Sequence, residues 1–174
     1  MNDTTNHVIA LVDGSEYSES VCDHTAWFAH RAGAAVSVVH LISRHHPEDE
    51  GSNRSGSIGL GARTALLAEL AELDTKRARL AQKRGRAILV DAQERLARAG
   101  IAEVATRLRH GEVVETLQEM ETDASLILIG KRGEEHRADS PLLGSNLERA
   151  VRATKKPLLV ASRGFREPKR FLLA

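Results

Sequence analysis

The stretch His7-Val8-Ile9-Ala10-Leu11-Val12, followed directly by Asp13-Gly14-Ser15, decides the fold class of this chain. The run is short, almost wholly apolar and rich in branched side chains, which is typical of a strand covered on both faces. Residues 103–108 alternate apolar and polar side chains instead, which predicts an edge strand. The near-continuous apolar pattern recurs at residues 35–42, 125–129 and 157–161.

Helical periodicity lies between the predicted strands. Val21, Thr25 and Phe28 recur at helical spacing before Gly33, which predicts an amphipathic helix closed by a glycine cap. Regular alternation of strands and helices predicts α/β crossover units around a mostly parallel sheet. We therefore expect one α/β domain over residues 1–162, followed by a basic tail over residues 163–174.

Residues 43–99 depart from this alternation. Residues 43–63 hold one proline, four glycines and four serines, which predicts a long mobile loop. Residues 64–99 predict a charged helix that Gly85 breaks or bends, because glycine is about 1 kcal/mol less favourable than alanine inside a helix. Four leucines at helical spacing predict a buried stripe on this helix, namely Leu66, Leu70, Leu73 and Leu80.

Composition excludes several classes of protein. The apolar fraction is 41% and the charged fraction 28%, which is typical of a globular protein and excludes a disordered chain. Cys22 is the single cysteine, which excludes a disulfide scaffold and fits a reducing compartment. No apolar run reaches the roughly 20 residues that cross a bilayer, and the polar start lacks a leader pattern. The scattered aromatic side chains offer no platform for nucleic acid. We expect a cytoplasmic protein without a membrane or nucleic-acid partner.

Two glycine turns and one carboxylate are candidates for a binding site. Asp13 follows the first strand, where ligands of open α/β sheets bind, although Asp and Ser also serve there as helix caps. Gly130-Lys131-Arg132-Gly133 follows the fourth apolar run, and Gly144-Ser145-Asn146 opens a helix. Glycines let the backbone approach a phosphate, and a helix N-terminus favours an anion. Ser145 and Glu148 equally fit a capping box, so both interpretations stay open.

Other candidates carry less. Gly56 and Gly61 have the spacing of a phosphate-binding P-loop but lack its lysine, which excludes that motif. His45 and His46 lie beside acidic residues and are expected to bind metal loosely at most, and no metal site or catalytic residue is assigned. Cys22 lies on an amphipathic helix and is interpreted as a small buried side chain.

These pieces together resemble the universal stress protein family over residues 7–162. The resemblance is carried by residues 8–15, by Val38-Val39-His40-Leu41, and by Gly130-Lys131-Arg132-Gly133 with Gly144-Ser145-Asn146. It implies an open, Rossmann-like parallel sheet of five strands in the order 3-2-1-4-5, with helices on both faces. The spacing between Gly133 and Gly144 is ten residues rather than nine, and the segment before residue 99 is longer than in short members.

The resemblance also implies an adenine-nucleotide site. Asp13 matches the carboxylate that faces the nucleoside, and Leu41 matches the position whose backbone meets adenine. The phosphate positions are matched by Gly130, Arg132, Gly133, Gly144, Ser145 and Asn146.

We expect ATP, ADP or AMP as ligand, with or without Mg²⁺, in a stress-response sensor that forms a homodimer through its last strand and meets a further protein partner. We expect at most slow ATP hydrolysis. Two alternatives stay open: a dimeric interaction module that binds no nucleotide, and a weak ATPase or autophosphorylating protein that uses Ser15 or Ser145 as acceptor. The tail is either disordered or packed on a partner subunit.

Overall fold

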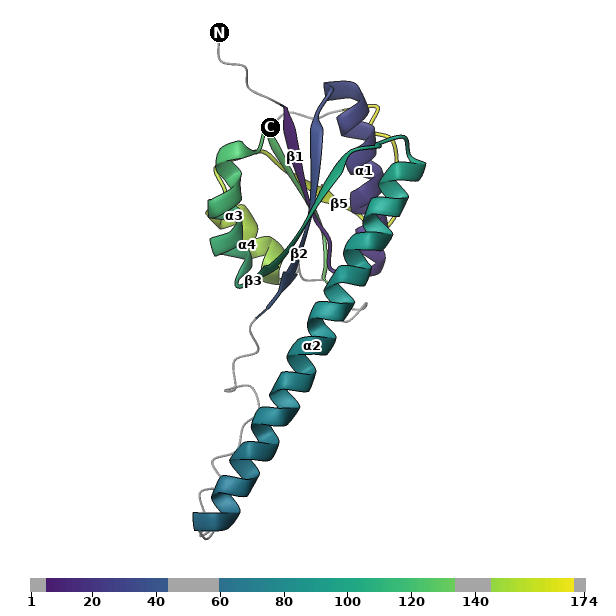
Figure 1. Cartoon of the computed structure of the whole chain (residues 1–174). Helices are drawn as coiled ribbons and strands as arrows, with labels where there is room; N and C mark the ends of the chain where they lie inside the picture. Colours follow the sequence, from purple (N-terminus) through teal and green to yellow (C-terminus); the bar gives the residue numbers. More distant parts are fainter. Residues whose placement is uncertain (1–5, 44–59, 134–144, 171–174) are drawn as a thin grey trace.

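A parallel sheet with helices on both faces organises the chain (Figure 1). The structure is a computed structural model that describes residues 6–43, 60–133 and 145–170. The strands β1 to β5 lie in the order β3-β2-β1-β4-β5, which confirms the expected fold class and strand order. They span His7–Leu11, Ala35–Ile42, Val104–His110, Leu126–Gly130 and Leu158–Ala161. The α-helices α1 to α4 span Glu16–Ala32, Leu60–Arg98, Val113–Met120 and Ser145–Ala153, and the short 3-10 helix η2 spans Glu121–Asp123.

The continuous apolar strands are explained by two cores, one on each face of the sheet. Val8 and Ala10 of β1 pack into the core beneath α1 and α2. Ile9 and Leu11 point to the other face and pack beneath α3 and α4. Since successive side chains of a strand point to opposite faces, a strand covered on both sides must be apolar at every position. The edge strand predicted at residues 103–108 is β3, which pairs with β2.

Helix α1 begins and ends where its sequence predicts. The Ser15 hydroxyl accepts the backbone N–H of Tyr17 at 3.3 Å, so Ser15 serves as the N-terminal cap. Gly33 adopts φ +60°, a left-handed conformation that glycine tolerates best, and ends the helix. Val21 and Thr25 of the predicted stripe lie on the face of α1 that is turned away from solvent, and both are fully buried.

Of the two outcomes predicted at Gly85, a break or a bend of the second helix, the break is wrong. Helix α2 runs without interruption from Leu60 to Arg98, through Gly85. A Cβ atom at this position would lie 2.6 Å from Leu108 Cδ1 and 2.8 Å from His40 Cδ2. At Gly85, α2 therefore lies so close to β2 and β3 that there is no space for a side chain. Tertiary packing outweighs the low helix propensity of glycine.

The first half of α2 differs from expectation in a second way. Its four leucines were expected to form a buried stripe, but Leu66, Leu70, Leu73 and Leu80 are 45%, 47%, 45% and 66% exposed. Figure 1 shows the reason, because this half of α2 extends beyond the sheet and meets no other described element. The loop predicted over residues 43–63 is wrong at residues 60–63, which are helical, while residues 44–59 lie outside the described residues.

The beginning of the C-terminal tail lies against α1 of the same chain. Phe165 meets the ring of His24 edge-on, with 4.8 Å between the ring centroids. Glu167 pairs with Arg31, and Arg163 pairs with Glu16. Residues 163–170 thus lie along α1, and their charges are opposite to those of the α1 residues they meet: Arg163 at its acidic start and Glu167 at its basic end. Residues 171–174 lie outside the described residues.

Candidate functional site

A cleft of about 270 Å³ opens at the carboxyl ends of β1, β2 and β4. This edge is the switch point of the sheet, because the chain continues from β1 to β2 on one side while β4 lies on the other. Open α/β sheets bind their ligands at this position. The volume is close to the lower bound of about 300 Å³ for small-molecule sites. The residues of the strand ends that line it include Leu11, Val12, Asp13, His40, Leu41, Ile129, Gly130, Arg132 and Gly133.

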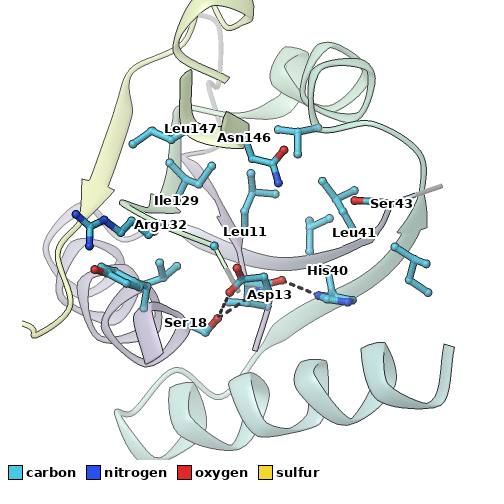
Figure 2. Close-up of a pocket in the computed structure, with 18 of the residues that line it drawn as sticks. Leu11, Asp13, Ser18, His40, Leu41, Ser43, Ile129, Arg132, Asn146 and Leu147 are labelled. Atoms are coloured by element: carbon cyan, nitrogen blue, oxygen red, sulfur yellow. Dashed lines mark hydrogen bonds between the residues drawn. The ribbon is translucent and has the colours of Figure 1, made fainter. Parts of the chain in front are cut away.

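Asp13 is held in one orientation by the first turn of α1. Its Oδ1 accepts hydrogen bonds from the backbone N–H of Ser15 and from the Ser18 hydroxyl, both at 3.0 Å. The Ser18 hydroxyl in turn accepts the backbone N–H groups of Asp13 and Gly14 at 3.1 and 3.0 Å. This closed network fixes the carboxylate at the floor of the cleft, as Figure 2 shows. Capping and binding are therefore compatible roles for Asp13.

The glycine turn after β4 faces this carboxylate. A Cβ atom at Gly133 would lie 2.9 Å from Asp13 Oδ2, and one at Gly130 would lie 2.8 Å from Tyr17 Cβ. Side chains at either position would fill the space between the turn and the start of α1. Arg132 lies between the two glycines, is half-buried and lines the cleft. The Gly130–Gly133 turn thus brings its backbone close to the start of α1 and places the cationic side chain of Arg132 at the same rim of the cleft.

The end of β2 forms the opposite wall. Leu41 is half-buried and lines the cleft, with its backbone at the sheet edge beside β3. His40 is buried, and its Nδ1–H donates to the Val12 carbonyl oxygen at 2.8 Å. That hydrogen bond ties β2 to the residue before Asp13. The wall is therefore apolar at Leu41 and Ile42, and polar at His40, at Ser43 and through its backbone.

The N-terminus of α4 closes the cleft on its third side. Figure 2 places Asn146 and Leu147 across the cleft from Asp13. Ser145 is the first residue of α4, so its helix N-terminus meets the cleft as predicted. Gly144 and the side chain of Ser145 lie outside what the structure describes. The two interpretations of Ser145, a phosphate contact and a capping box, therefore both stay predictions. Of the eight predicted site residues, the structure brings six together: Asp13, Leu41, Gly130, Arg132, Gly133 and Asn146.

Some lining residues were not found from the sequence. Ser18 belongs to the Asp13 network, yet a serine inside a helix gives no signal of its own. Ala81 and Arg84 line the cleft from α2, and Val113 lines it from α3. Their positions depend on how each helix packs against the sheet, which periodicity alone does not give. Arg84 adds a second cationic side chain to a cleft whose described lining holds Asp13 as its one carboxylate.

Other candidates from the sequence are not brought to the cleft. Burial raises the pKa of the Cys22 thiol to about 12, which fits the small buried side chain that was expected. Ser15 is engaged as the cap of α1. Over residues 6–43, 60–133 and 145–170 there is no cluster of metal-ligating side chains and no helix with the length and apolar character of a membrane span. His45 and His46 lie outside these ranges.

Comparison with known proteins points to one family. Residues 4–162 match the model of the universal stress protein family. The chain is 31% identical over 169 residues to universal stress protein Slr1230 of Synechocystis sp., covering 97% of this chain but 59% of that protein. It thus spans less than two thirds of this curated relative.

Solved structures share the fold. A universal stress protein crystallised in complex with cAMP is 21% identical, with a TM-score of 0.58, and the match covers 92% of this chain and 98% of that one. The universal stress protein from Archaeoglobus fulgidus in complex with dAMP is 19% identical, with a TM-score of 0.57 and coverage of 90% and 97%.

Proposed function

The chain belongs to the universal stress protein family, and from that membership we propose that its cleft binds ATP or a related adenine nucleotide. The observation that carries the proposal is the meeting of Asp13, Leu41 and the Gly130–Gly133 turn in one cleft at the switch point of the sheet. The cAMP and dAMP complexes of two structures with the same fold support adenine nucleotides as the ligand class.

The nucleoside would occupy the side of the cleft between β1 and β2. The fixed Asp13 carboxylate is an acceptor for ribose hydroxyl groups, and it is already oriented by Ser15 and Ser18. Adenine would lie against the Leu41 wall, where an apolar side chain covers its ring and the strand backbone offers hydrogen bonds at its edge. Because Asp13 is anionic, it would keep phosphates away from this side.

The phosphates would occupy the side between β4 and α4. The N-terminus of α4 offers unpaired backbone N–H groups and a partial positive charge. Gly130 and Gly133 leave space beside Tyr17 and Asp13 that side chains would fill, so a phosphate can approach the backbone closely. Arg132 supplies a positive charge at the same rim. We assign Gly144, Ser145 and Asn146 to this phosphate site as well.

Mg²⁺ would arrive with ATP as the companion ion of its phosphates, and it would neutralise part of their charge. We propose no more than slow hydrolysis. The one carboxylate in the described lining, Asp13, is bound to Ser15 and Ser18, and the other ring nitrogen of His40, Nε2, faces Gly85 of α2. Neither group is placed as a base that would activate water against a terminal phosphate.

The proposed role is that of a cytoplasmic sensor. Nucleotide contacts from both glycine turns would hold residues 130–145 in one conformation and change the surface that a protein partner meets. The coupling cannot exceed the difference in nucleotide affinity between the two states of this surface. We also propose a homodimer through β5, which is an edge strand that pairs with β4 alone in the described part of the chain.

Isothermal titration calorimetry with ATP, ADP and AMP tests the binding proposal. Gly133→Ala should weaken ATP binding at least about tenfold, since a displaced carboxylate and a narrowed turn cost about 1.4 kcal/mol or more. Gly164→Ala is the matched control, because a Cβ there meets nothing within 4 Å. Equal ATP affinity in the two variants would reject the phosphate assignment. No heat and no thermal stabilisation by any of the three nucleotides would reject the proposal itself.

A further inference from the structure

The first half of α2 presents an apolar face with no described neighbour. Every residue from Leu66 to Leu80 is exposed. Leu66, Leu70, Leu73 and Leu80 repeat with the spacing of coiled-coil contact positions, and Leu67 lies beside them. Their exposed fractions lie between 45% and 66%. Covering this face would remove its apolar surface from water and so stabilise this half of the helix.

Over residues 6–43, 60–133 and 145–170, no other element of the chain covers these leucines. The segment that leads into α2, residues 43–59, contains Ile58 and Pro47 but otherwise consists of glycine and polar or charged residues. Such a composition cannot bury five leucines. The described tail is occupied along α1, through Phe165 and Glu167. A second chain is a source of apolar surface that the described residues of this chain do not supply.

The charges along α2 identify this partner. Residues 66–74 carry three acidic and no basic side chains, whereas residues 75–86 carry six basic and no acidic ones. Two parallel copies would place like charges opposite each other. Two antiparallel copies centred on the leucines would instead bring Glu69 of each helix beside Lys76 of the other, so that opposite charges flank the apolar contact. The charged residues are Glu69, Glu72, Asp74, Lys76, Arg77, Arg79, Lys83, Arg84 and Arg86.

We propose that the leucine face of α2, made of Leu66, Leu67, Leu70, Leu73 and Leu80, docks antiparallel onto the same face of a second copy of this chain. The two-fold axis would pass between Leu70 and Leu73, so that Leu70 of one copy packs against the partner subunit's Leu73. Glu69 would then lie beside the partner subunit's Lys76. This interface is separate from β5 and would add to a dimer formed there.

Sedimentation velocity of the full chain tests the docking. The double variant Leu70→Glu with Leu73→Glu should lose the association through α2, so that its assembly has half the mass of the wild-type assembly. The reason is that pairing would bury four glutamates at the axis. Ala68→Glu with Thr75→Glu is the matched control, since both residues are exposed and lie on the opposite side of the helix. This control should sediment like the wild type. Equal masses for the wild type and the leucine double variant overturn the proposal, whichever other partner covers the leucines.

Charge reversal tests the orientation. In the antiparallel pair, Glu69→Lys and Lys76→Glu should each weaken association about tenfold, through two reversed ion pairs. Mixing the two variants should restore association, because each lysine then meets a glutamate. In a parallel pair Glu69 would face the partner subunit's Asp74, so Glu69→Lys would strengthen association, and that result overturns the proposal.

Nucleotide binding provides an independent readout. The replaced Leu73 and Leu70 lie about two and about three helical turns before Ala81, the nearest lining residue of the cleft on α2. ATP affinity should therefore be unchanged in the leucine double variant. Failure of the nucleotide proposal and failure of the docking proposal are distinguished in the same set of proteins.

Discussion

Replacing Gly85 by alanine separates helix propensity from packing at a single position. Propensity alone predicts a gain of about 1 kcal/mol, because Gly85 lies inside the continuous helix α2. Packing predicts a loss, since the new methyl group would lie 2.6 Å from Leu108 Cδ1 and 2.8 Å from His40 Cδ2. The two effects have opposite signs, so the measured sign decides between them.

The contact with His40 determines the magnitude. Leu108 is half-buried and its Cδ1 is the end of a flexible side chain, which can change rotamer at small cost. His40 is buried and bound to the Val12 carbonyl, so its ring can move only by stretching that hydrogen bond. Overpacking of this kind costs about 1–3 kcal/mol. Subtracting the propensity gain of about 1 kcal/mol leaves a net destabilisation of about 1 kcal/mol.

Urea denaturation followed by circular dichroism measures the change in the free energy of unfolding. In a thermal scan, a loss of about 1 kcal/mol lowers the Tm by about 2–4 °C. The same substitution in a His40→Ala background is the control. Removing the ring should recover at least half of the cost, as a coupling between Gly85 and His40. A Gly85→Ala protein that is more stable than the wild type by the full propensity gain would refute the packing argument, and so would an identical effect in both backgrounds.

Three further predictions concern other parts of the chain. Glu121 accepts hydrogen bonds from Lys155 N and Thr154 Oγ1, which hold the pKa of its carboxyl below the ordinary value of 4.5. Its contribution to stability is therefore present above pH 4.5 and is lost as pH falls further, so the stability difference between the wild type and Glu121→Gln, measured by urea titration, should vanish in acid. Cys22 has a pKa raised to about 12 by burial, so a thiol reagent at pH 8 should modify it only after unfolding; rapid reaction of the native protein would contradict its buried placement. Leu96→Ala should cost about 2–5 kcal/mol because Leu96 is fully buried, whereas the exposed Leu80→Ala should stay within about 0.5 kcal/mol in the dissociated chain; equal losses would refute the burial assignment.

The fold was predictable because each strand carries its own burial pattern. Val8 to Val12 are apolar at every position, and only a strand covered on both faces requires this. Periodicity did not reveal that Leu66 and Leu70 lie beyond the sheet. An apolar stripe shows that a helix has a face to cover, but it does not show whether the same chain provides the cover. The error at Gly85 has a related cause, because propensity contains no information about a neighbouring histidine.

The residues of the candidate site were predictable from the sequence where they follow the end of a strand, because the sheet alone then fixes where they lie. Asp13, Gly130 and Gly133 follow strand ends directly, so the parallel sheet brings them to one edge whatever the helices do. Arg84 and Ser18 reach the cleft through the rotation of a helix about its axis. That rotation is set by packing contacts, which a single sequence does not specify. The backbone near Leu41 was found through family resemblance rather than through any pattern of its own.

One close contact links the two surfaces of α2. At Gly85 the helix lies close to His40 and Leu108, and the two sides of this point have different surroundings. Toward the C-terminus, Leu89 and Leu96 enter the core. Toward the N-terminus, Arg84 and Ala81 line the cleft, and the leucine face begins one residue beyond Ala81. The absence of a side chain at Gly85 therefore allows α2 to approach β2 and β3 this closely.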